Sequence, residues 1–272
     1  MFKESNFKAA AIDWLIAKGE LDKGAVLINE LPVDGFSRRA DLVVANGKLQ
    51  AFEIKSDADS LIRLEGQIET YLRFFDKVTL ICSRKFTEKA KKTLPKQVEI
   101  VEVNFASPQS PKLIIKRRGK AELVTSSRHF LSFVDKRHLV QALRKRGIAS
   151  STADTHQELY EKYRNLPVTF CRSVVLDYLK SKYKATHDNF VAFRNENTAV
   201  GDLELLSPNK QADIEETASQ EDDEDLEQWG AIDDTKLMRA GALDITQSMK
   251  KVGMVVDKPV LVIPRACKVS GA

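Results

Sequence analysis

The sequence predicts a mixed α/β fold, followed by a helical region and an acidic linker. Three observations lead to this prediction. Residues 4–18 repeat apolar side chains at helical spacing, residues 25–55 contain three short segments of strand character, and residues 57–76 return to helical spacing. A near-continuous apolar run at 78–82 then indicates a buried strand.

The first helix is predicted because five apolar side chains share one face: Phe7, Ala10, Ala11, Trp14 and Leu15. Gly19 and Gly24 follow it, as is typical of a helix end and the loop beyond it. The first strand is expected over 25–31, and Asp34-Gly35 indicates the turn that ends it.

An Asn-Gly pair at 46–47 marks the turn between the second and third strands. A two-residue loop would place Asp41 opposite Phe52, on the other face from Glu53. A three-residue loop over 46–48, with glycine in the left-handed conformation, places Asp41 opposite Glu53. The second register also gathers an apolar stripe: Leu42, Val44, Phe52 and Ile54. We therefore expect the three-residue loop or a bulge.

Four side chains on these strands form the predicted active site: Glu30, Asp41, Glu53 and Lys55. Glu53 and Lys55 share one face because side chains alternate along a strand. Asp41 and Glu53 supply hard carboxylate oxygens that suit Mg²⁺ or Mn²⁺, and the backbone carbonyl of Ile54 adds another ligand. The metal would activate a water that Lys55 orients, and Glu30 is expected at the rim. An ordinary charged sheet face is the alternative interpretation.

The helix expected over 57–76 carries an apolar stripe: Leu61, Leu64, Ile68, Leu72 and Phe75. Asp59 or Ser60 is expected to cap its N-terminus. A polar line at i, i+4 and i+8 flanks the stripe: Arg63, Gln67 and Tyr71. We expect this line to contact the phosphates of a nucleic acid, with a solvated helix flank as the alternative.

These motifs resemble the PD-(D/E)XK nuclease superfamily. Asp41 and the Glu53-Ile54-Lys55 run match its signature, and QIETY at 67–71 resembles the Gln-x-x-x-Tyr motif of its exonuclease-like branch. The stretches RADLVV, FEIKSDADSLIRLEGQIETY and FDKVTLI are similar to a branch of bacterial and phage proteins. The resemblance implies a restriction-endonuclease-like core of order αβββαβ and metal-dependent cleavage of DNA, with RNA as the alternative. It covers residues 5–105, under half of the chain.

Two positions depart from the superfamily pattern. Ala40 precedes Asp41 where the signature has proline, a frequent variation in the superfamily. Glu30 falls on an expected strand, whereas the superfamily's further acid is helical. The domain is completed by a basic helix at 85–93, an edge strand at 98–103 and a basic turn at 116–120, so that its expected extent is 1–120.

Residues 121–196 are predicted to form a helical module. Its helices are expected at 136–145, after Thr155, and at 174–183. The run LVQALRKRGIASSTADTHQELYEKY resembles a SAP-like helix-loop-helix that binds DNA. That resemblance implies phosphate rather than base contacts for three side chains: Arg144, Lys145 and Arg146. A plain helical accessory domain is the alternative.

Charge changes abruptly along the chain. Residues 197–272 hold 15 Asp plus Glu against 8 Lys plus Arg, so residues 1–196 carry a net charge of +11. A basic body favours binding of a polyanion through counterion release. Residues 197–235 are acidic and poor in apolar side chains, which predicts a disordered linker. Such a linker is also a candidate phosphate mimic that covers the basic cleft.

Apolar residues return in 236–272, most clearly in PVLVIP at 259–264. An apolar segment after an acidic linker is typical of a docking segment, so we expect a protein partner or self-association there. The alternative is that this strand joins the parent sheet.

Other features exclude several classes of protein. Three scattered cysteines indicate a reducing compartment without a metal cage, and the four histidines lack the spacing of a zinc site. We find no apolar run of membrane-spanning length and no signal peptide, so we expect a cytoplasmic protein without membrane contact.

The sequence therefore predicts a magnesium-dependent nuclease that binds DNA. Two alternatives stay open: a catalytically silent nucleic-acid-binding protein, and an adaptor that acts through residues 236–272. The patterns do not discriminate endonuclease from exonuclease action, or among repair, phage biology and defence.

Overall fold

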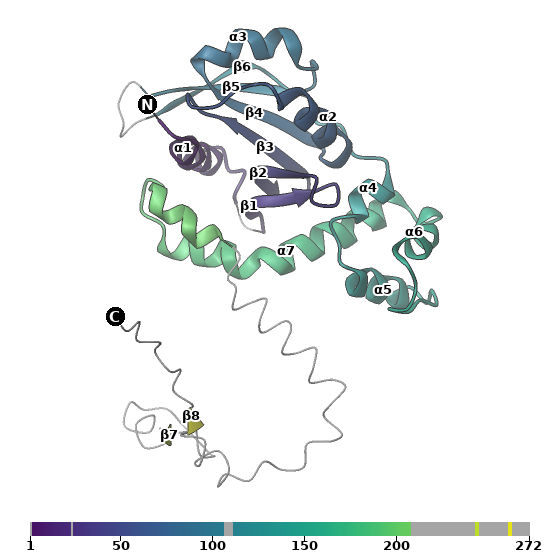
Figure 1. Cartoon of the computed structure of the whole chain (residues 1–272). Coiled ribbons are helices and arrows are strands. Elements are labelled where there is room, and N and C mark those ends of the chain that lie inside the picture. The colour runs from purple at the N-terminus through teal and green to yellow at the C-terminus, as the bar shows by residue number, and fades with distance from the viewer. Residues whose placement is uncertain (1, 23, 106–110, 208–242, 245–260, 263–272) are drawn as a thin grey trace, which may run out of the picture. The chain divides into compact units, whose positions relative to one another are not determined.

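The computed structural model describes these residues: 2–22, 24–105 and 111–207, with the backbone of 243–244 and 261–262. The chain divides into two compact units, Met1–Asn209 and Lys210–Ala272. In the second unit, β7 (Leu243–Asp244) pairs antiparallel with β8 (Leu261–Val262). All other described elements belong to the first unit (Figure 1).

A six-stranded mixed sheet lies at the centre of the first unit, in the order β1-β2-β3-β4-β5-β6. Its strands are β1 (Val26–Val33), β2 (Arg38–Ala45), β3 (Leu49–Lys55), β4 (Lys77–Ser83), β5 (Glu99–Asn104) and β6 (Lys112–Arg117). β3, β4 and β5 run parallel, and the other neighbours pair antiparallel. The mixed α/β prediction is confirmed, while the first two residues of the basic turn expected at 116–120 belong to β6.

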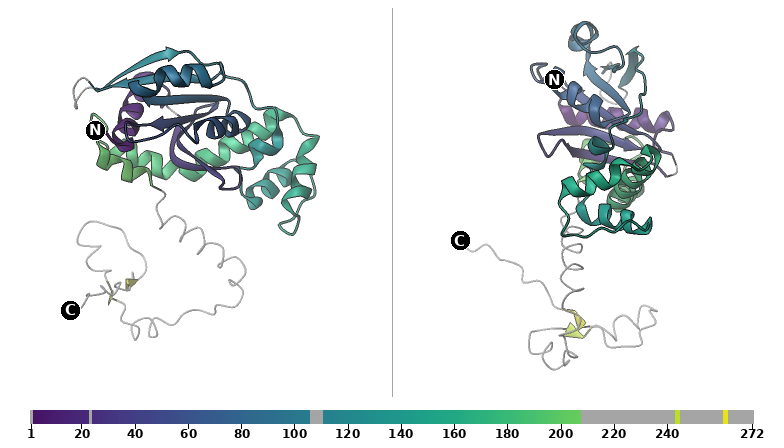
Figure 2. Two further views of the ribbon diagram at one scale, coloured as in Figure 1. Left: turned by 45° about the horizontal axis from the view of Figure 1, so that its top comes forward. Right: turned by 90° about the vertical axis from the view of Figure 1, so that its right-hand side faces the viewer.

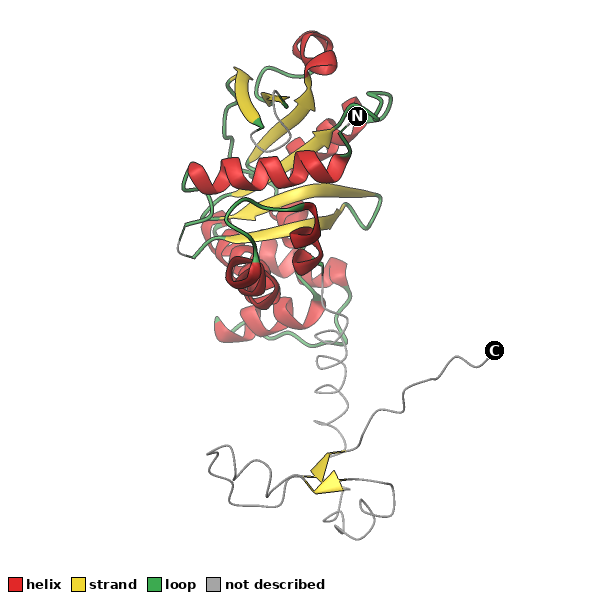
Figure 3. Cartoon of the chain, turned by 90° about the vertical axis from the view of Figure 1, so that its left-hand side faces the viewer, coloured by secondary structure: helices red, strands yellow, loops and turns green. Residues whose placement is uncertain are grey.

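Helices cover both faces of this sheet (Figure 3). They are α1 (Glu4–Ala17), α2 (Leu64–Phe74), α3 (Arg84–Thr93), α4 (Ser127–Leu131), α5 (Lys136–Lys145), α6 (His156–Arg164), α7 (Val168–Phe193) and the 3-10 helix η1 (Val200–Leu206). Because strand side chains alternate, β2 and β3 contribute to two cores. The predicted apolar stripe packs in the core that includes α1. The residues that alternate with it along the strands pack in the core that includes α2: Val43, Ala45 and Ala51.

The helical region does not have a core of its own among the described residues. Phe130, Leu143 and Val175 belong to the same buried cluster as the sheet residues Val43 and Leu80. The expected separation between 1–120 and 121–196 is therefore not seen as a break in packing. The third helix of this region is also longer than the predicted 174–183, because apolar side chains continue along the full length of α7.

α7 lies beside β1, the first edge strand of the sheet (Figures 1 and 2). Leu179 joins the core that includes α2, and Phe190 joins the core that includes α1. Between them, buried His187 accepts a hydrogen bond at Nδ1 from the backbone N–H of Leu27, at 3.3 Å. α7 thus supplies a hydrogen-bond acceptor to an edge strand whose backbone would otherwise be open to pairing with another strand.

Residues 197–207 were expected to begin the disordered linker, and this boundary is wrong. Asp13 of α1 accepts hydrogen bonds from the Thr198 backbone N–H at 3.0 Å and its hydroxyl at 2.6 Å. Leu206 of η1 is buried against the α1-side core. The rest of the expected linker, 208–235, lies outside the described residues. So does the docking segment 236–272, except for the backbone of β7 and β8.

Asp76 joins the sheet to the helical region. Its fully buried carboxylate receives two hydrogen bonds from Arg172 of α7, at 2.8 and 2.6 Å. It also accepts from the backbone N–H groups of Leu49, at 2.9 Å, and Val124, at 3.0 Å. The Arg172 guanidinium lies 4.8 Å from the ring centroid of Phe130. The Asp76 carboxylate therefore ties its own segment to three others that are distant in sequence.

Replacing Arg172 by methionine should lower the free energy of unfolding by about 3–5 kcal/mol, because it leaves the buried Asp76 carboxylate without its counter-ion. Urea denaturation followed by circular dichroism measures this. Arg164→Met is the matched control, since the Arg164–Glu161 pair is exposed and should contribute at most about 1 kcal/mol. Equal effects of the two substitutions would contradict the role of Asp76.

Stability should fall as the pH drops from 7 to 5, in part through His187. Burial lowers the pKa of His187, so the unfolded chain takes up this proton at a higher pH than the folded chain does. His187→Gln removes the titration and keeps an acceptor for Leu27. We expect the loss of unfolding free energy between pH 7 and 5 to be smaller in this variant. An identical loss in both proteins would exclude His187 as a cause.

Candidate active site

The β2–β3 hairpin has the predicted register. Residues 46–48 form its loop, Gly47 has a φ of +97°, and the Asn46 N–H donates to the Lys48 carbonyl at 3.1 Å. The paired residues run from Ala45 opposite Leu49 to Leu42 opposite Phe52. Continued by one residue, this register sets Asp41 opposite Glu53. The three-residue loop is confirmed, and with it the neighbourhood of the two acids.

Asp41 lies where the two strands stop pairing. The last pair is Leu42 with Phe52, and beyond it the Ile54 N–H donates to Asp41 Oδ2 at 2.6 Å. The carboxylate thus takes the place of a backbone acceptor between the two strands. On the other side of β2, Glu30 interrupts the pairing of β1 with a φ of +61°. The open end of the hairpin therefore gathers acidic groups from three strands.

Glu53 is fully buried on β3. Its Oε1 is ion-paired with Lys55 Nζ, whereas Oε2 has no hydrogen-bond partner among the described residues. Burial raises the pKa of Glu53, and Lys55 with the nearby polar groups of Tyr71 and Gln67 opposes this only in part. A buried carboxylate oxygen without a partner is costly, so this oxygen is available to a cation.

Asp41 has a raised pKa as well. The first cause is burial, the second is the negative charge of Glu53, and the hydrogen bond from Ile54 opposes them. Two neighbouring carboxylates whose pKa values are both raised are a typical feature of catalytic sites, although structural networks also produce it.

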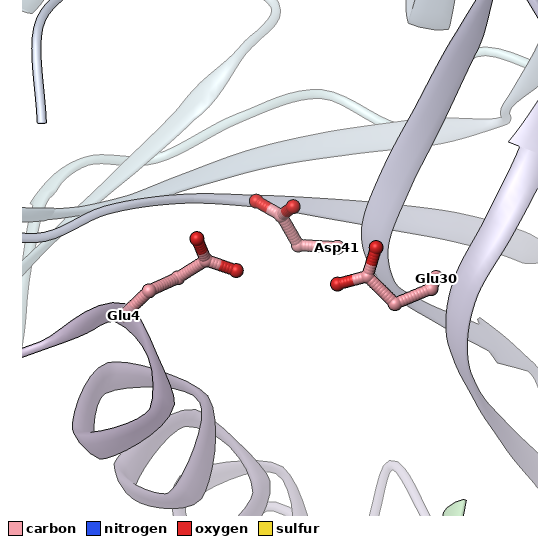
Figure 4. A group of neighbouring side chains, drawn as sticks. All are labelled: Glu4, Glu30 and Asp41. Atoms are coloured by element: carbon pink, nitrogen blue, oxygen red, sulfur yellow. The ribbon is translucent and has the colours of Figure 1, made fainter. Parts of the chain in front are cut away.

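Glu30 on β1 and Glu4 on α1 complete the acidic cluster. Carboxylate oxygens of Glu4, Glu30 and Asp41 lie within 4.8 Å of one another, and Figure 4 shows the three carboxylates directed toward a common space. Glu53 is not in this group. The described residues thus offer two overlapping sets of oxygens, one with Asp41 and Glu53 and one with Asp41, Glu4 and Glu30.

Two basic side chains balance this cluster. Lys8 Nζ is ion-paired with Glu30 and lies 3.1 Å from Glu4 Oε1, and Arg39 is ion-paired with Glu30 from its exposed side. Burial by itself would lower the pKa of Lys8, but the hydrogen bond and charge of Glu30, with the charges of Asp41 and Glu4, raise it. The Lys8 ammonium therefore remains charged among the acids.

Glu4 and Lys8 were not predicted as site residues. They lie one turn apart at the start of α1, and α1 packs against the face of the sheet that carries Leu42 and Ile54. The sequence holds one signal for them, an i, i+4 pair of opposite charges next to the predicted apolar face. That signal is common on solvated helices. Only the packing of α1 on the sheet brings the pair to Asp41.

The acids line an open cleft of about 710 Å³. Its other lining residues include Phe36, Arg38, Arg39, Ile54, Lys55, Asp59, Arg63 and Gln67. Arg63 and Gln67 of the predicted polar line are therefore on the cleft. Tyr71 is not: it is fully buried, and its hydroxyl donates to the Arg39 carbonyl at 2.7 Å. Tyr71 lies on the buried face of α2, and its hydroxyl supports the backbone of β2.

The helix after Lys55 begins later than predicted, at Leu64 instead of residue 57. Asp59 does not cap it, because its carboxylate accepts from the backbone N–H and hydroxyl of Ser56, at 2.7 and 2.6 Å. Residues 56–63 therefore form a loop that carries Asp59 and Arg63 to the cleft.

The three basic residues of the SAP-like run lie outside the cleft lining. Arg144 donates to the Ser150 carbonyl at 2.8 Å, and the Arg146 guanidinium lies 4.3 Å from the Phe170 ring. Lys145 lines a separate hollow between α5 and α7. Two of the three side chains thus contact the helical region itself from its exposed surface. The run spans α5 and α6, and its resemblance to a SAP-like motif stays a prediction.

The residues present fit a divalent cation. Every candidate ligand is a hard oxygen donor, and one of the buried oxygens, Glu53 Oε2, has no hydrogen-bond partner within the described ranges. Mg²⁺ or Mn²⁺ would be held by Asp41 and Glu53, with Glu4 and Glu30 beside them.

No helix in the described part of the chain has the length and hydropathy needed to cross a membrane.

Comparison with known proteins gives one curated relative and one solved structure. The structure is a protein of unknown function from Silicibacter pomeroyi, 17% identical, with a TM-score of 0.34, covering 55% of this chain and 97% of that chain. The relative is protein cII of Enterobacteria phage P4, 37% identical over 213 residues, or 77% of this chain and 80% of the relative. The family model for bacteriophage P4 protein cII matches residues 1–207. The chain therefore belongs to the bacteriophage P4 protein cII family.

Proposed function

We propose that the chain is a nuclease of the PD-(D/E)XK type, with a restriction-endonuclease-like core, that uses Mg²⁺ or Mn²⁺ to hydrolyse phosphodiester bonds in DNA. The observation that carries this proposal is the buried pair Asp41 and Glu53 beside Lys55, at the open end of the β2–β3 hairpin.

The charges on the cleft support a need for an added cation. Four acids meet there, Glu4, Glu30, Asp41 and Glu53, and three basic groups are ion-paired with them: Lys8, Arg39 and Lys55. Burial and this crowding of acids raise the pKa of Asp41, and burial raises that of Glu53. A divalent cation held by these oxygens would favour their ionised forms and offset the charge of a phosphodiester.

Each residue then has a defined part in the proposed reaction. A bound divalent cation supplies polarisation of the phosphate and a lower pKa for a nearby water. Asp41 and Glu53 hold the cation, while Lys55 orients the water and stabilises charge that develops on the phosphate. Gln67 and Arg63 lie on the cleft lining, where they are suited to contact the substrate backbone.

Replacing Glu53 by glutamine or Lys55 by methionine should reduce the rate of DNA cleavage at least about 100-fold, the loss typical of one electrostatic catalytic group. Cleavage is measured on circular, linear and single-stranded DNA, and on RNA, with Mg²⁺, Mn²⁺ or EDTA. Glu99→Gln is the matched control, because Glu99 is also buried, in the same sheet and paired with a lysine, Lys77, at 2.8 Å.

Cleavage that requires metal, survives Glu99→Gln and disappears in the two site variants would support the proposal. Metal-independent cleavage, or cleavage that the site variants retain, would overturn it. Salt-sensitive DNA binding without any cleavage would favour the silent binding protein, and absence of both would favour the adaptor. Circular dichroism of each variant separates loss of activity from loss of folding.

Lys8→Gln tests where the cation binds. If the Glu4, Glu30 and Asp41 oxygens contribute, removing the ammonium between them should lower the half-saturating Mg²⁺ concentration about fivefold, the effect of about 1 kcal/mol of relieved repulsion. Lys77→Gln is the control, since Lys77 is paired with Glu99 outside the cleft. Isothermal titration with Mg²⁺ or Mn²⁺ measures the affinity. An unchanged affinity would restrict the cation to Asp41 and Glu53.

A further inference from the structure

Phe36 is an exposed aromatic side chain on the rim of the cleft. It lies in the turn between β1 and β2, lines the cleft, and has 84% of its surface exposed. The 56–63 loop brings Arg63 to the same cleft. An aromatic ring left in water on the rim of a cleft has its apolar face free to stack on a ligand there.

The backbone of the turn holds Phe36 in this position. Asp34, Gly35 and Phe36 have φ values of +53°, +62° and +70°. The left-handed region is unfavourable for a phenylalanine, and such conformations concentrate at functional sites. Hydrogen bonds from Ser37 to Asp34, at 3.2 Å from the backbone N–H and 3.3 Å from the hydroxyl, fix the turn. The hydrogen-bonded turn therefore keeps the Phe36 ring exposed to solvent.

Three arginines share the cleft with Phe36. Arg38 and Arg39 follow it in the chain, Arg63 lies in the 56–63 loop, and all three are exposed residues of the cleft lining. A flat apolar ring among guanidinium groups is the combination that binds single-stranded nucleic acid: the ring stacks on a base and the cations contact the phosphates. An apolar protein partner would have less use for the arginines.

We propose that Phe36 stacks on an unpaired nucleobase, so that the cleft takes single-stranded or locally unpaired nucleic acid. The inference depends on the proposed nuclease function for its choice of nucleic acid as the ligand. Bases inside a duplex are already stacked on one another, and an aromatic side chain reaches them only if the duplex is distorted at a cost. Phe36 should therefore discriminate between unpaired and fully paired substrates.

The test measures binding instead of cleavage, with the full chain in EDTA. Fluorescence anisotropy gives the Kd for a labelled single-stranded DNA, the same sequence as RNA, and the DNA duplex. Phe36→Ala should weaken single-strand binding about 5- to 150-fold, the range for loss of one stacked base, and leave duplex binding within about twofold. Phe36→Tyr should bind as the wild type, and Phe36→Leu as the alanine variant. The DNA and RNA arms show which strand is preferred.

Phe193→Ala is the matched control, because Phe193 is 73% exposed at the end of α7 and lies outside the cleft lining. It should not change either affinity. Quenching of a 2-aminopurine base by the wild type, lost in Phe36→Ala, would support stacking directly. Equal losses on single strands and duplexes, no effect of Phe36→Ala, or no binding of single strands would each overturn the inference.

The two proposals fail separately. Selective, Phe36-dependent binding by a protein that never cleaves would uphold the stacking role and overturn the nuclease. Metal-dependent cleavage that needs Glu53, together with single-strand binding that Phe36→Ala does not change, would support the nuclease and overturn the stacking role.

Discussion

The buried carboxylate of Asp76 is the constraint on which the arrangement of the first unit depends. It stands between α2 and β4, and it needs several hydrogen-bond donors because an unpaired buried charge is costly. Arg172 of α7 and the backbone at Leu49 and Val124 supply them. Meeting that need fixes the entry of β3, the segment before α4 and the start of α7. From there α7 reaches β1 and, through η1, the helix α1 that bears Glu4 and Lys8.

The candidate active site solves the same electrostatic problem differently. At Asp76 the donors come from the protein, and the carboxylate is fully paired. At Asp41 and Glu53 the protein supplies fewer donors. Burial raises both pKa values, the charge of Glu53 raises that of Asp41 further, and Glu53 Oε2 has no hydrogen-bond partner in the described part of the chain. The structural acid is thus satisfied and the candidate catalytic acids are not. This contrast between acids of one fold is the physical basis of the proposed cation site.

The cleft also depends on parts of the chain that carry no candidate chemistry. Tyr71 is buried in α2, yet its hydroxyl holds the β2 backbone at Arg39, next to Asp41. Asp13 of α1 binds Thr198, so residues beyond the expected end of the folded body help to hold the helix that carries Glu4. A local change in either place would move acids on the cleft without touching them.

The sequence by itself determined the features that depend on local spacing. Side-chain alternation and the Asn-Gly turn were sufficient for the β2–β3 register, the neighbourhood of Asp41 and Glu53, and the two faces of the sheet, because these follow from geometry over a few residues. Only the tertiary structure decided what depends on packing between distant segments. It brought Glu4 and Lys8 to Asp41, buried Tyr71, set Arg144 and Arg146 against Ser150 and Phe170, and extended the body to Leu206. The burial of a given helix face is set by what packs on it, and the spacing of its residues does not reveal that partner.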